Sequence, residues 1–379
     1  MADTSQTVLK IKDLDISFHS ETETVHAIRG VDIELKRGET VAIVGESGSG
    51  KSVSMKAVMG ILPDSAVINS GEILIYDDAG STDQPKNVSP AEKASSGQSA
   101  DRMIDLLKMD EKNIRKSIRG KRIAMVFQDP MTSLNPTMTI GNQLITAIRS
   151  HEKISKDEAH DRAVTLLLEV GITEPERRMR QYPHEFSGGM RQRIVIAIAL
   201  SCDPEILICD EPTTALDVTI QDKILDLIVS LQRKRSLSVI YITHDLGVVA
   251  KVADYVCVMY AGRIIEKGTI FDVFFDPKHP YTWGLLEAIP DPESEGDLMT
   301  IPGTPPVLTS DPVGDAFAPR NPYALEIDLK KGAPMFRVSE SHYAATWLLD
   351  ERAPEVSMPD GLKKRIDRMK KEVCDYARE

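Results

Sequence analysis

The sequence has no apolar run long enough to cross a bilayer, and its first residues show neither the basic region nor the apolar core of a signal peptide. Cysteine is scarce, with no C-x-x-C pair among the four residues Cys202, Cys209, Cys257 and Cys374. Their spacing does not support a metal site. All but Cys374 have apolar neighbours and are expected to be buried, reduced thiols, which favours a cytosolic protein.

An excess of basic residues is also missing. Against 46 Lys and Arg the chain carries 58 Asp and Glu, which gives a formal net charge of −12 at pH 7. This balance argues against a protein whose main ligand is nucleic acid. The remaining composition is ordinary for a globular protein, 41% hydrophobic and 27% charged, and 379 residues suffice for two domains or for one large domain with an appendage.

The most informative segment is 45–52, which fits the pattern G-x-x-x-x-G-K-[ST] at every fixed position. An apolar, β-rich run at 40–44 precedes it and a helix-compatible run at 53–59 follows it, which is the strand–loop–helix context of a phosphate-binding loop. Such a loop surrounds phosphate oxygens with backbone N–H groups, its lysine adds a positive charge, and its last hydroxyl can ligate Mg²⁺. We therefore expect nucleotide phosphates to be bound by Gly45, Glu46, Ser47, Gly48, Ser49, Gly50, Lys51 and Ser52.

A second apolar run, 206–209, ends in the carboxylates Asp210 and Glu211. A buried strand aims such residues at the carboxyl edge of a parallel sheet, where ligands of α/β proteins bind. There Asp210 can hold Mg²⁺, directly or through water, and Glu211 can activate a water molecule near the terminal phosphate. An exposed acidic pair without a role is the alternative, and the phosphate loop in the same chain favours the catalytic interpretation.

The first part of the chain, 1–270, is expected to form a nucleotide-binding domain. β-rich runs at 8–18 and 25–35 predict a small antiparallel layer over the nucleotide site, and later alternation of strands and helices predicts a parallel sheet. Helical patterns dominate about 130–200. Within this domain, the polar residues 77–99 predict a surface insertion.

Three further predictions concern shorter segments. Residues 103–107 are expected to form a short helical turn, and 256–268 a closing hairpin around Ala261 and Gly262. Proline then becomes frequent, which predicts an irregular extension at 271–350. A charged, amphipathic helical tail is expected at 351–379.

The segment 186–193, Phe-Ser-Gly-Gly-Met-Arg-Gln-Arg, resembles the signature of ATP-binding cassette (ABC) ATPases. The resemblance implies that Ser187, Gly188 and Gly189 meet the terminal phosphate held by an opposite subunit. It also implies the positions of the remaining family motifs, which occur in the family's order: Gln128 as the Q-loop glutamine that senses Mg²⁺, Asp217 in the D-loop at the dimer interface, His244 as the switch histidine, and Phe18 as the aromatic that stacks on adenine. Taken singly, Gln128 could be a surface residue, and His244 and Phe18 could belong to the core.

The fold implied by this resemblance is α/β, a P-loop NTPase of the ABC nucleotide-binding type, with a parallel-sheet core, an antiparallel β subdomain and a helical subdomain. The segments 127–136, 214–221, 279–282 and 301–306 further resemble the oligopeptide/dipeptide/nickel uptake group. Many members of that group hold an iron–sulfur cluster on four cysteines of the C-terminal extension. The matching positions here are Asp315, Asn321, Asp328 and Thr346, so we expect no iron–sulfur cluster.

The resemblance implies an ATPase, with ATP and Mg²⁺ as cofactors, that powers uptake of a peptide-like solute. Mg²⁺ would lie among Ser52, Gln128 and Asp210, and the catalytic residues would be Glu211, His244 and Gln128. The implied partners are a second, different ATPase subunit, two membrane permease subunits and a solute-binding protein, with no nucleic acid. The implied place is peripheral, at the cytoplasmic face of the inner membrane.

Three other functions stay open at this point. Uptake of nickel or another non-peptide solute fits the same group. A soluble ABC ATPase acting on ribosomes or DNA is disfavoured by the single phosphate loop and the lack of a long heptad run. A regulatory subunit without hydrolysis is disfavoured because Glu211 and His244 are both present.

Overall fold

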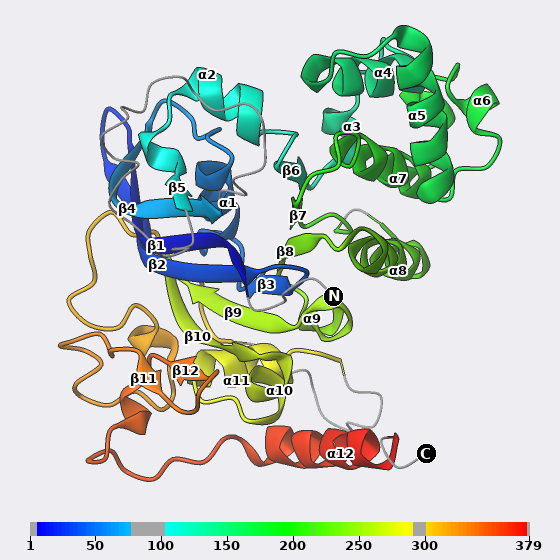
Figure 1. Ribbon diagram of the computed structural model, residues 1–379. Coiled ribbons are helices and arrows are strands. Elements are labelled where there is room, and N and C mark those ends of the chain that lie inside the picture. The colour runs from blue at the N-terminus through cyan, green and yellow to red at the C-terminus, as the bar shows by residue number, and fades with distance from the viewer. Residues whose placement is uncertain (1–5, 77–102, 215, 291–300, 377–379) are drawn as a thin grey trace, which may run out of the picture.

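The computed structural model describes residues 6–76, 103–214, 216–290 and 301–376 (Figure 1). The predicted insertion at 77–99 lies outside these residues. No helix in the described ranges combines the length and the apolar character needed to cross a bilayer.

The core of the molecule is an eight-stranded sheet in the order β11-β12-β10-β9-β3-β8-β7-β6. Strands β3, β6, β7, β8 and β9 run parallel, and β10, β11 and β12 continue the sheet in antiparallel pairing. Every residue of β3, β7 and β8 is buried, as is typical of central strands covered on both faces. The strands are β3 Thr40–Val44, β6 Ile123–Val126, β7 Ile206–Asp210, β8 Ser238–Thr243, β9 Tyr255–Tyr260, β10 Arg263–Thr269, β11 Phe336–Arg337 and β12 Tyr343–Ala344.

A second, antiparallel sheet has the order β2-β1-β4-β5. It comprises β1 Thr7–His19, β2 Thr24–Lys36, β4 Ala66–Tyr76 and β5 Met103–Asp105. Its inner residues share one core with the main sheet and with α1 (Lys51–Val58). Ile114, which follows the short α2 (Glu111–Asn113), packs against the same core. The predicted antiparallel layer is therefore present.

The prediction of a helical turn at 103–107 is wrong for its first three residues. Met103–Asp105 form the edge strand β5, in which Asp105 pairs with Leu74 of β4. Only then does a single 3-10 turn follow, Leu106–Lys108, capped by the Asp105 side chain. The open edge of β4 supplies backbone partners that a short isolated turn lacks, so pairing overrides the local helical preference.

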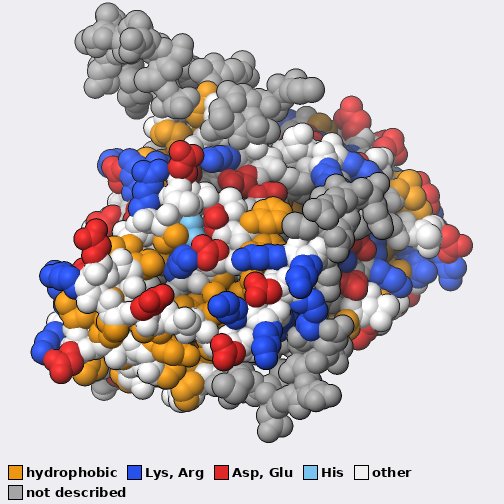
Figure 2. All heavy atoms as spheres, turned by 90° about the horizontal axis from the view of Figure 1, so that it is seen from below, with side chains coloured by type: hydrophobic (Ala, Val, Ile, Leu, Met, Phe, Trp, Pro, Cys, Tyr) orange, Lys and Arg blue, Asp and Glu red, His pale blue; other side chains and the backbone are white. Residues whose placement is uncertain are grey.

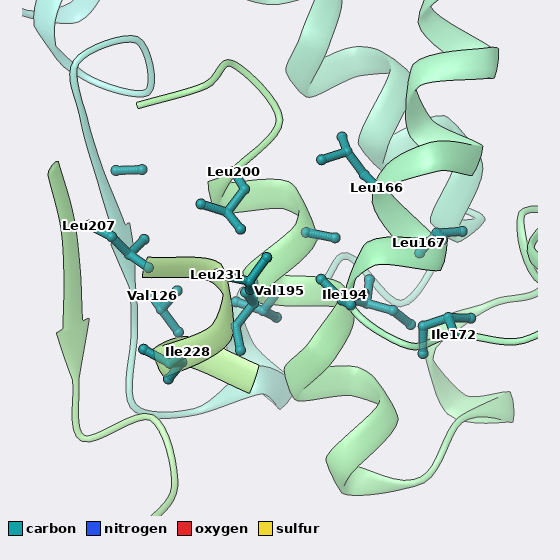
Figure 3. Close-up of a cluster of buried hydrophobic side chains, with 14 of the residues drawn as sticks. Val126, Leu166, Leu167, Ile172, Ile194, Val195, Leu200, Leu207, Ile228 and Leu231 are labelled. Atoms are coloured by element: carbon teal, nitrogen blue, oxygen red, sulfur yellow. The ribbon is translucent and has the colours of Figure 1, made fainter. Parts of the chain in front are cut away.

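A helical lobe stands apart from the antiparallel sheet, on the side of β6 and β7 (Figure 1). It comprises α3 Pro130–Ser133, α4 Ile140–His151, α5 Lys156–Glu169, α6 Pro175–Arg178 and α7 Gly188–Ala199, with α8 Val218–Arg235 and α9 Leu246–Val252 following along the chain. Figure 3 shows how apolar side chains of α5, α7 and α8 meet those of the two strands, for example Val195, Ile228 and Leu207. The lobe is thus fixed to the sheet by a continuous core.

The extension after β10 is more regular than the proline content indicates. It contains α10 Ile270–Phe275, α11 Pro280–Glu287, the β11–β12 hairpin and α12 Asp360–Tyr376. Leu362 and Ile366 of α12 are buried in the core formed with α10 and α11. This helix lies within the range 351–379 for which the sequence predicts a helical tail. Figure 2 views the molecule from the side of α12, where acidic and basic side chains are interspersed between apolar patches.

A buried carboxylate joins this extension to the main sheet. Glu266 of β10 is fully buried and accepts hydrogen bonds from the backbone N–H groups of Lys278 and His279, at 2.6 and 3.0 Å. The ring of His342, just before β12, lies 2.8 Å from the same carboxylate. Such a satisfied buried group specifies how three distant segments meet.

Asp315, Asn321, Asp328 and Thr346, the four positions at which the resemblance predicts cysteines in relatives, have local hydrogen-bond partners. Asp315 and Asn321 accept hydrogen bonds from the backbone N–H groups two residues later, as does the Thr346 hydroxyl. Asp328 accepts from the N–H of Leu325. These side chains thus stabilise turns of the extension through oxygen acceptors.

Candidate active site

The phosphate loop connects β3 to the first turn of α1, and two glycines fix its shape. Gly45 has φ 153°, and a Cβ there would lie 2.1 Å from the carbonyl oxygen of Met259. Gly50 caps α1 with φ 104°, and a Cβ there would lie 2.9 Å from the carbonyl oxygen of Ala27. Neither position accepts a side chain, so the loop passes close to β9 and β2 and opens the N-terminus of α1 toward the cavity.

Lys51 is buried at the start of α1. Its ammonium donates hydrogen bonds to the carbonyl oxygens of Gly45 and Glu46, at 2.7 and 2.9 Å. Burial lowers the pKa of Lys51, although nearby carboxylates, with Glu211 the strongest, act in the opposite direction. A phosphate group in the loop would add the negative charge that this buried cation lacks.

The next hydroxyl meets the first carboxylate of the 210–211 pair. Ser52 donates a hydrogen bond of 2.7 Å to Asp210, which ends β7. Burial raises the pKa of Asp210, and the hydrogen bond from Ser52 offsets part of that effect. A hydroxyl and a buried carboxylate at this separation offer the hard oxygen ligands that Mg²⁺ prefers, so these residues fit the expected ion.

Glu211 is the centre of a hydrogen-bonded group. Gln128 and Thr214 donate to one carboxylate oxygen, at 3.2 and 3.1 Å, and Nδ1 of His244 lies 3.3 Å from the other. The backbone of Glu211 has φ 46°, and its N–H donates to the carbonyl oxygen of Ile242 in β8. This unusual backbone geometry turns the carboxylate away from the strand direction and toward the phosphate loop.

These residues line one cavity of about 750 Å³. Its volume lies within the roughly 300–1,000 Å³ typical of small-molecule sites. The lining residues are Ala27, Glu46, Ser47, Gly48, Ser49, Gly50, Lys51, Ser52, Val53, Gln128, Glu211, Thr214, His244, Leu285 and Pro305. The structure therefore brings the predicted phosphate loop together with Gln128, Glu211 and His244.

Other predicted residues lie away from this cavity. Ser187, Gly188 and Asp217 are exposed, and Gly189 is half-buried, with a Cβ that would meet Ile220 of α8. None of the four lines the cavity, and the close approach of Gly189 to α8 puts the signature segment and the D-loop on the same part of the surface.

Phe18 is half-buried beside the antiparallel core and is also absent from the cavity lining, where Ala27 of β2 stands instead. Its role in adenine stacking stays a prediction.

Five lining residues received no role from the sequence: Ala27, Val53, Thr214, Leu285 and Pro305. Thr214 donates a hydrogen bond to the Glu211 carboxylate. A hydroxyl three residues after a catalytic carboxylate is the sequence signal that could have predicted this role for Thr214. Leu285 and Pro305 belong to the extension, and nothing in the sequence pattern indicates that this part reaches the phosphate loop.

Comparison with known proteins identifies the family. The family model for ABC transporters matches residues 28–214, and the model for the C-terminal region of oligopeptide/dipeptide transporters matches residues 265–327. The chain is 52% identical over 365 residues to the oligopeptide transport ATP-binding protein OppD of Bacillus subtilis, covering 96% of this chain and 94% of that protein. The chain belongs to the ATP-binding subunits of ABC transporters, in the oligopeptide/dipeptide group.

Other relatives agree with this assignment. The dipeptide transport ATP-binding protein DppD of Lactococcus lactis is 49% identical, over 95% of this chain and 96% of its own length. Among solved structures, the dimeric ATP-binding cassette MJ0796 in a post-hydrolysis state with ADP and Pi superposes with a TM-score of 0.55, at 26% identity, over 69% of this chain and 98% of its own. The predicted fold is confirmed, and this ABC subunit is an ATPase that binds ATP.

Proposed function

We propose that this ABC subunit hydrolyses ATP at interfaces shared with a second ATPase subunit, and that hydrolysis drives uptake of di- or oligopeptides through two membrane permease subunits. The observation that carries the proposal is the separation of two sets of residues on one chain. The phosphate loop, Glu211 and His244 line one cavity, and Asp210 is bonded to Ser52 of the loop. The signature segment, in contrast, lies outside the cavity, and Ser187 and Gly188 are exposed. A second subunit would supply its own signature segment to this cavity.

In this mechanism the phosphate loop binds the ATP phosphates. Backbone N–H groups of the loop after Glu46 and the Lys51 ammonium bind the phosphate chain, and Lys51 exchanges its bonds to loop carbonyl oxygens for phosphate oxygens. Ser52, Asp210 and Gln128 would hold Mg²⁺, which neutralises phosphate charge when bound.

Glu211 then orients the attacking water and accepts its proton. Gln128 and Thr214 hold one oxygen of this carboxylate, which leaves the second oxygen, next to His244, facing the cavity. His244 stabilises the terminal phosphate from the same side. A positioned base of this kind accelerates a reaction by roughly 10² to 10⁴.

Coupling to the membrane subunits would run through the surface next to Gln128. Phe127 and Met131 flank this residue and are 39% and 61% exposed. These two side chains are candidate contacts with a permease subunit. We place the subunit at the cytoplasmic face of the membrane because its relatives are named transport ATP-binding proteins.

The peptide cargo is supported by the names of the relatives and by the matched C-terminal region. The test is affinity purification of the subunit from detergent-solubilised membranes, with mass spectrometry of the proteins that co-purify. We expect two polytopic membrane proteins, a second ATPase and a solute-binding protein. The binding protein is then titrated with di- and oligopeptides and with nickel; binding of nickel without peptides, or recovery of ribosomal or DNA-repair proteins alone, contradicts the proposal.

A further inference from the structure

Glu46, the second residue of the phosphate loop, is held by the C-terminal extension. The guanidinium of Arg320 donates to both of its carboxylate oxygens, at 2.7 and 3.0 Å. The backbone N–H of Glu46 donates to the hydroxyl of Tyr281, at 2.9 Å, and its carbonyl oxygen accepts from Lys51. One loop residue is thus fixed at three points, two of them from the extension.

Arg320 is itself immobilised. Its side chain is only 6% exposed, and its remaining N–H groups donate to the carbonyl oxygens of Pro302 and Gly303, at 2.7 and 3.2 Å. The hydrogen bonds to Glu46 raise the pKa of Arg320, so the guanidinium keeps its charge in this buried place. A two-point Arg–carboxylate contact restricts both position and angle.

Aromatic residues beside Arg320 restrict the movement of its side chain. Tyr260 at the end of β9, Tyr281 in α11 and Phe317 in the extension form an aromatic cluster with ring centroids 4.7–5.3 Å apart. Tyr260 also accepts a hydrogen bond of 3.3 Å from Arg320. Loop, sheet and extension therefore meet in one rigid cluster.

The same extension also forms part of the cavity wall. Pro305, and Leu285 from α11, line the cavity together with residues of the phosphate loop. The carbonyl oxygen of Leu308 accepts a hydrogen bond of 2.9 Å from the backbone N–H of His26, the residue before Ala27 in β2.

We propose that Arg320 is a positioning residue for nucleotide binding, and that the extension completes the ATP site by fixing Glu46 and hence the start of the phosphate loop. This inference rests on the proposed binding of ATP in the cavity. Because coupling between two sites is reciprocal, bound ATP should in turn stabilise the segment 301–308.

The test compares the full-length chain with Arg320→Met, using displacement of a fluorescent ATP analogue by ATP. We expect the ATP dissociation constant to rise about tenfold, within the range typical of coupled sites. Assembled with its partners, the variant should show a raised KM for ATP and a much smaller change in kcat. Adding Glu46→Gln should not weaken binding further, because both changes remove the same contact.

The matched control is Arg365→Met. Arg365 also bonds carbonyl oxygens in the extension, those of Leu286 and Ile289, but none of its contacts reaches Glu46. Its ATP affinity should equal that of the wild type. Equal weakening by both variants would mean general loosening of the extension and would overturn the inference.

If Arg320→Met fails to fold, the variant Tyr281→Phe tests the inference instead. It removes only the hydroxyl that accepts the hydrogen bond from the Glu46 N–H. A rise in the ATP dissociation constant of about threefold is expected for one lost hydrogen bond, and unchanged binding overturns the inference.

Hydrogen exchange of the backbone amides of 301–308 should slow at saturating ATP, and an unchanged exchange rate contradicts the inference. Lys51→Ala separates the two claims: if it binds ATP as the wild type does, the proposed site itself fails.

Discussion

Two regions of this subunit differ in how many of their polar groups have partners within the chain. They are the phosphate-loop half, around 45–52, and the signature half, around 187–189. Lys51 and Ser52 already have partners within the chain, and an extension more than 200 residues away braces Glu46. Ser187 and Gly188 face solvent, and among the described residues they contact their own helix and the turn that leads into α8. The first half is preorganised, whereas the second presents donors to something outside the chain.

This difference assigns separate tasks to the two halves. A preorganised loop can bind nucleotide in the isolated subunit, because little beyond the Lys51 side chain has to rearrange. An exposed helix N-terminus contributes only when a second subunit brings a phosphate to it. Changes in the first half should therefore affect binding or chemistry, and changes in the second should affect turnover only in the assembled pair.

The largest effect is expected for Glu211→Gln. The amide keeps the shape of the side chain but cannot accept a proton, so turnover in the assembled complex should fall at least about 100-fold while ATP binding remains. Phosphate release and equilibrium ATP binding measure the two quantities. Glu205→Gln is the matched control, since Glu205 directly precedes β7, five residues from Asp210, and pairs with Arg122. Near-wild-type hydrolysis by Glu211→Gln would remove Glu211 as the base.

A second large effect is expected for Gly188→Arg. A Cβ at Gly188 meets only Leu216, at an ordinary 3.5 Å, so the fold tolerates a side chain there. ATP binding by the isolated subunit should be unchanged, whereas turnover in the assembled pair should fall about 100-fold, the scale of a lost set of preorganised N–H donors. Leu329→Arg, at an exposed site of the extension, controls for the added charge. Weaker ATP binding by the isolated variant would break the distinction between the halves.

The phosphate-loop half could be predicted from the sequence better than the extension that supports it. Strand–loop–helix order and the carboxyl ends of parallel strands follow from local pattern, so the sequence alone places Lys51, Asp210 and Glu211 at one site. The Arg320–Glu46 contact joins residues 274 apart, and no periodicity reports such a pair. The strand β5 was missed for the same reason, because its partner strand lies beyond the insertion.

A moderate effect is expected for Phe18→Ala, which tests the adenine contact. If the half-buried ring stacks on the base, the ATP dissociation constant should rise about tenfold, as is typical of base–aromatic stacking. Phe18→Leu keeps the apolar bulk without an aromatic face and should lose nearly as much affinity. Unchanged binding together with a lower unfolding temperature would assign Phe18 to the core and leave the base contact to other residues of the preorganised half.

The smallest effect concerns a pH-sensitive contact between the extension and β2, in the phosphate-loop half. His26 of β2 lies 2.9 Å from Asp15 and 2.5 Å from Asp311. Burial opposes protonation, but the hydrogen bonds to Asp311 and Asp15 outweigh it and raise the pKa of His26 above its usual 6.5. Because the pKa is raised on folding, the stabilisation is complete below pH 6.5 and disappears as the pH rises through the higher, folded value.

The unfolding temperature of His26→Gln should therefore lie below that of the wild type at about pH 6, and the gap should close by about pH 8.5. Asp311 is 66% exposed, so the whole effect should amount to about 1 kcal/mol or less. His160→Gln is the control for the loss of a histidine, because the His160 ring lies 3.6 Å from exposed carboxylates. A gap that widens with pH would mean that neutral His26 is the stabilising form, and the extension would then be held to β2 by the backbone contact of Leu308 rather than by charge.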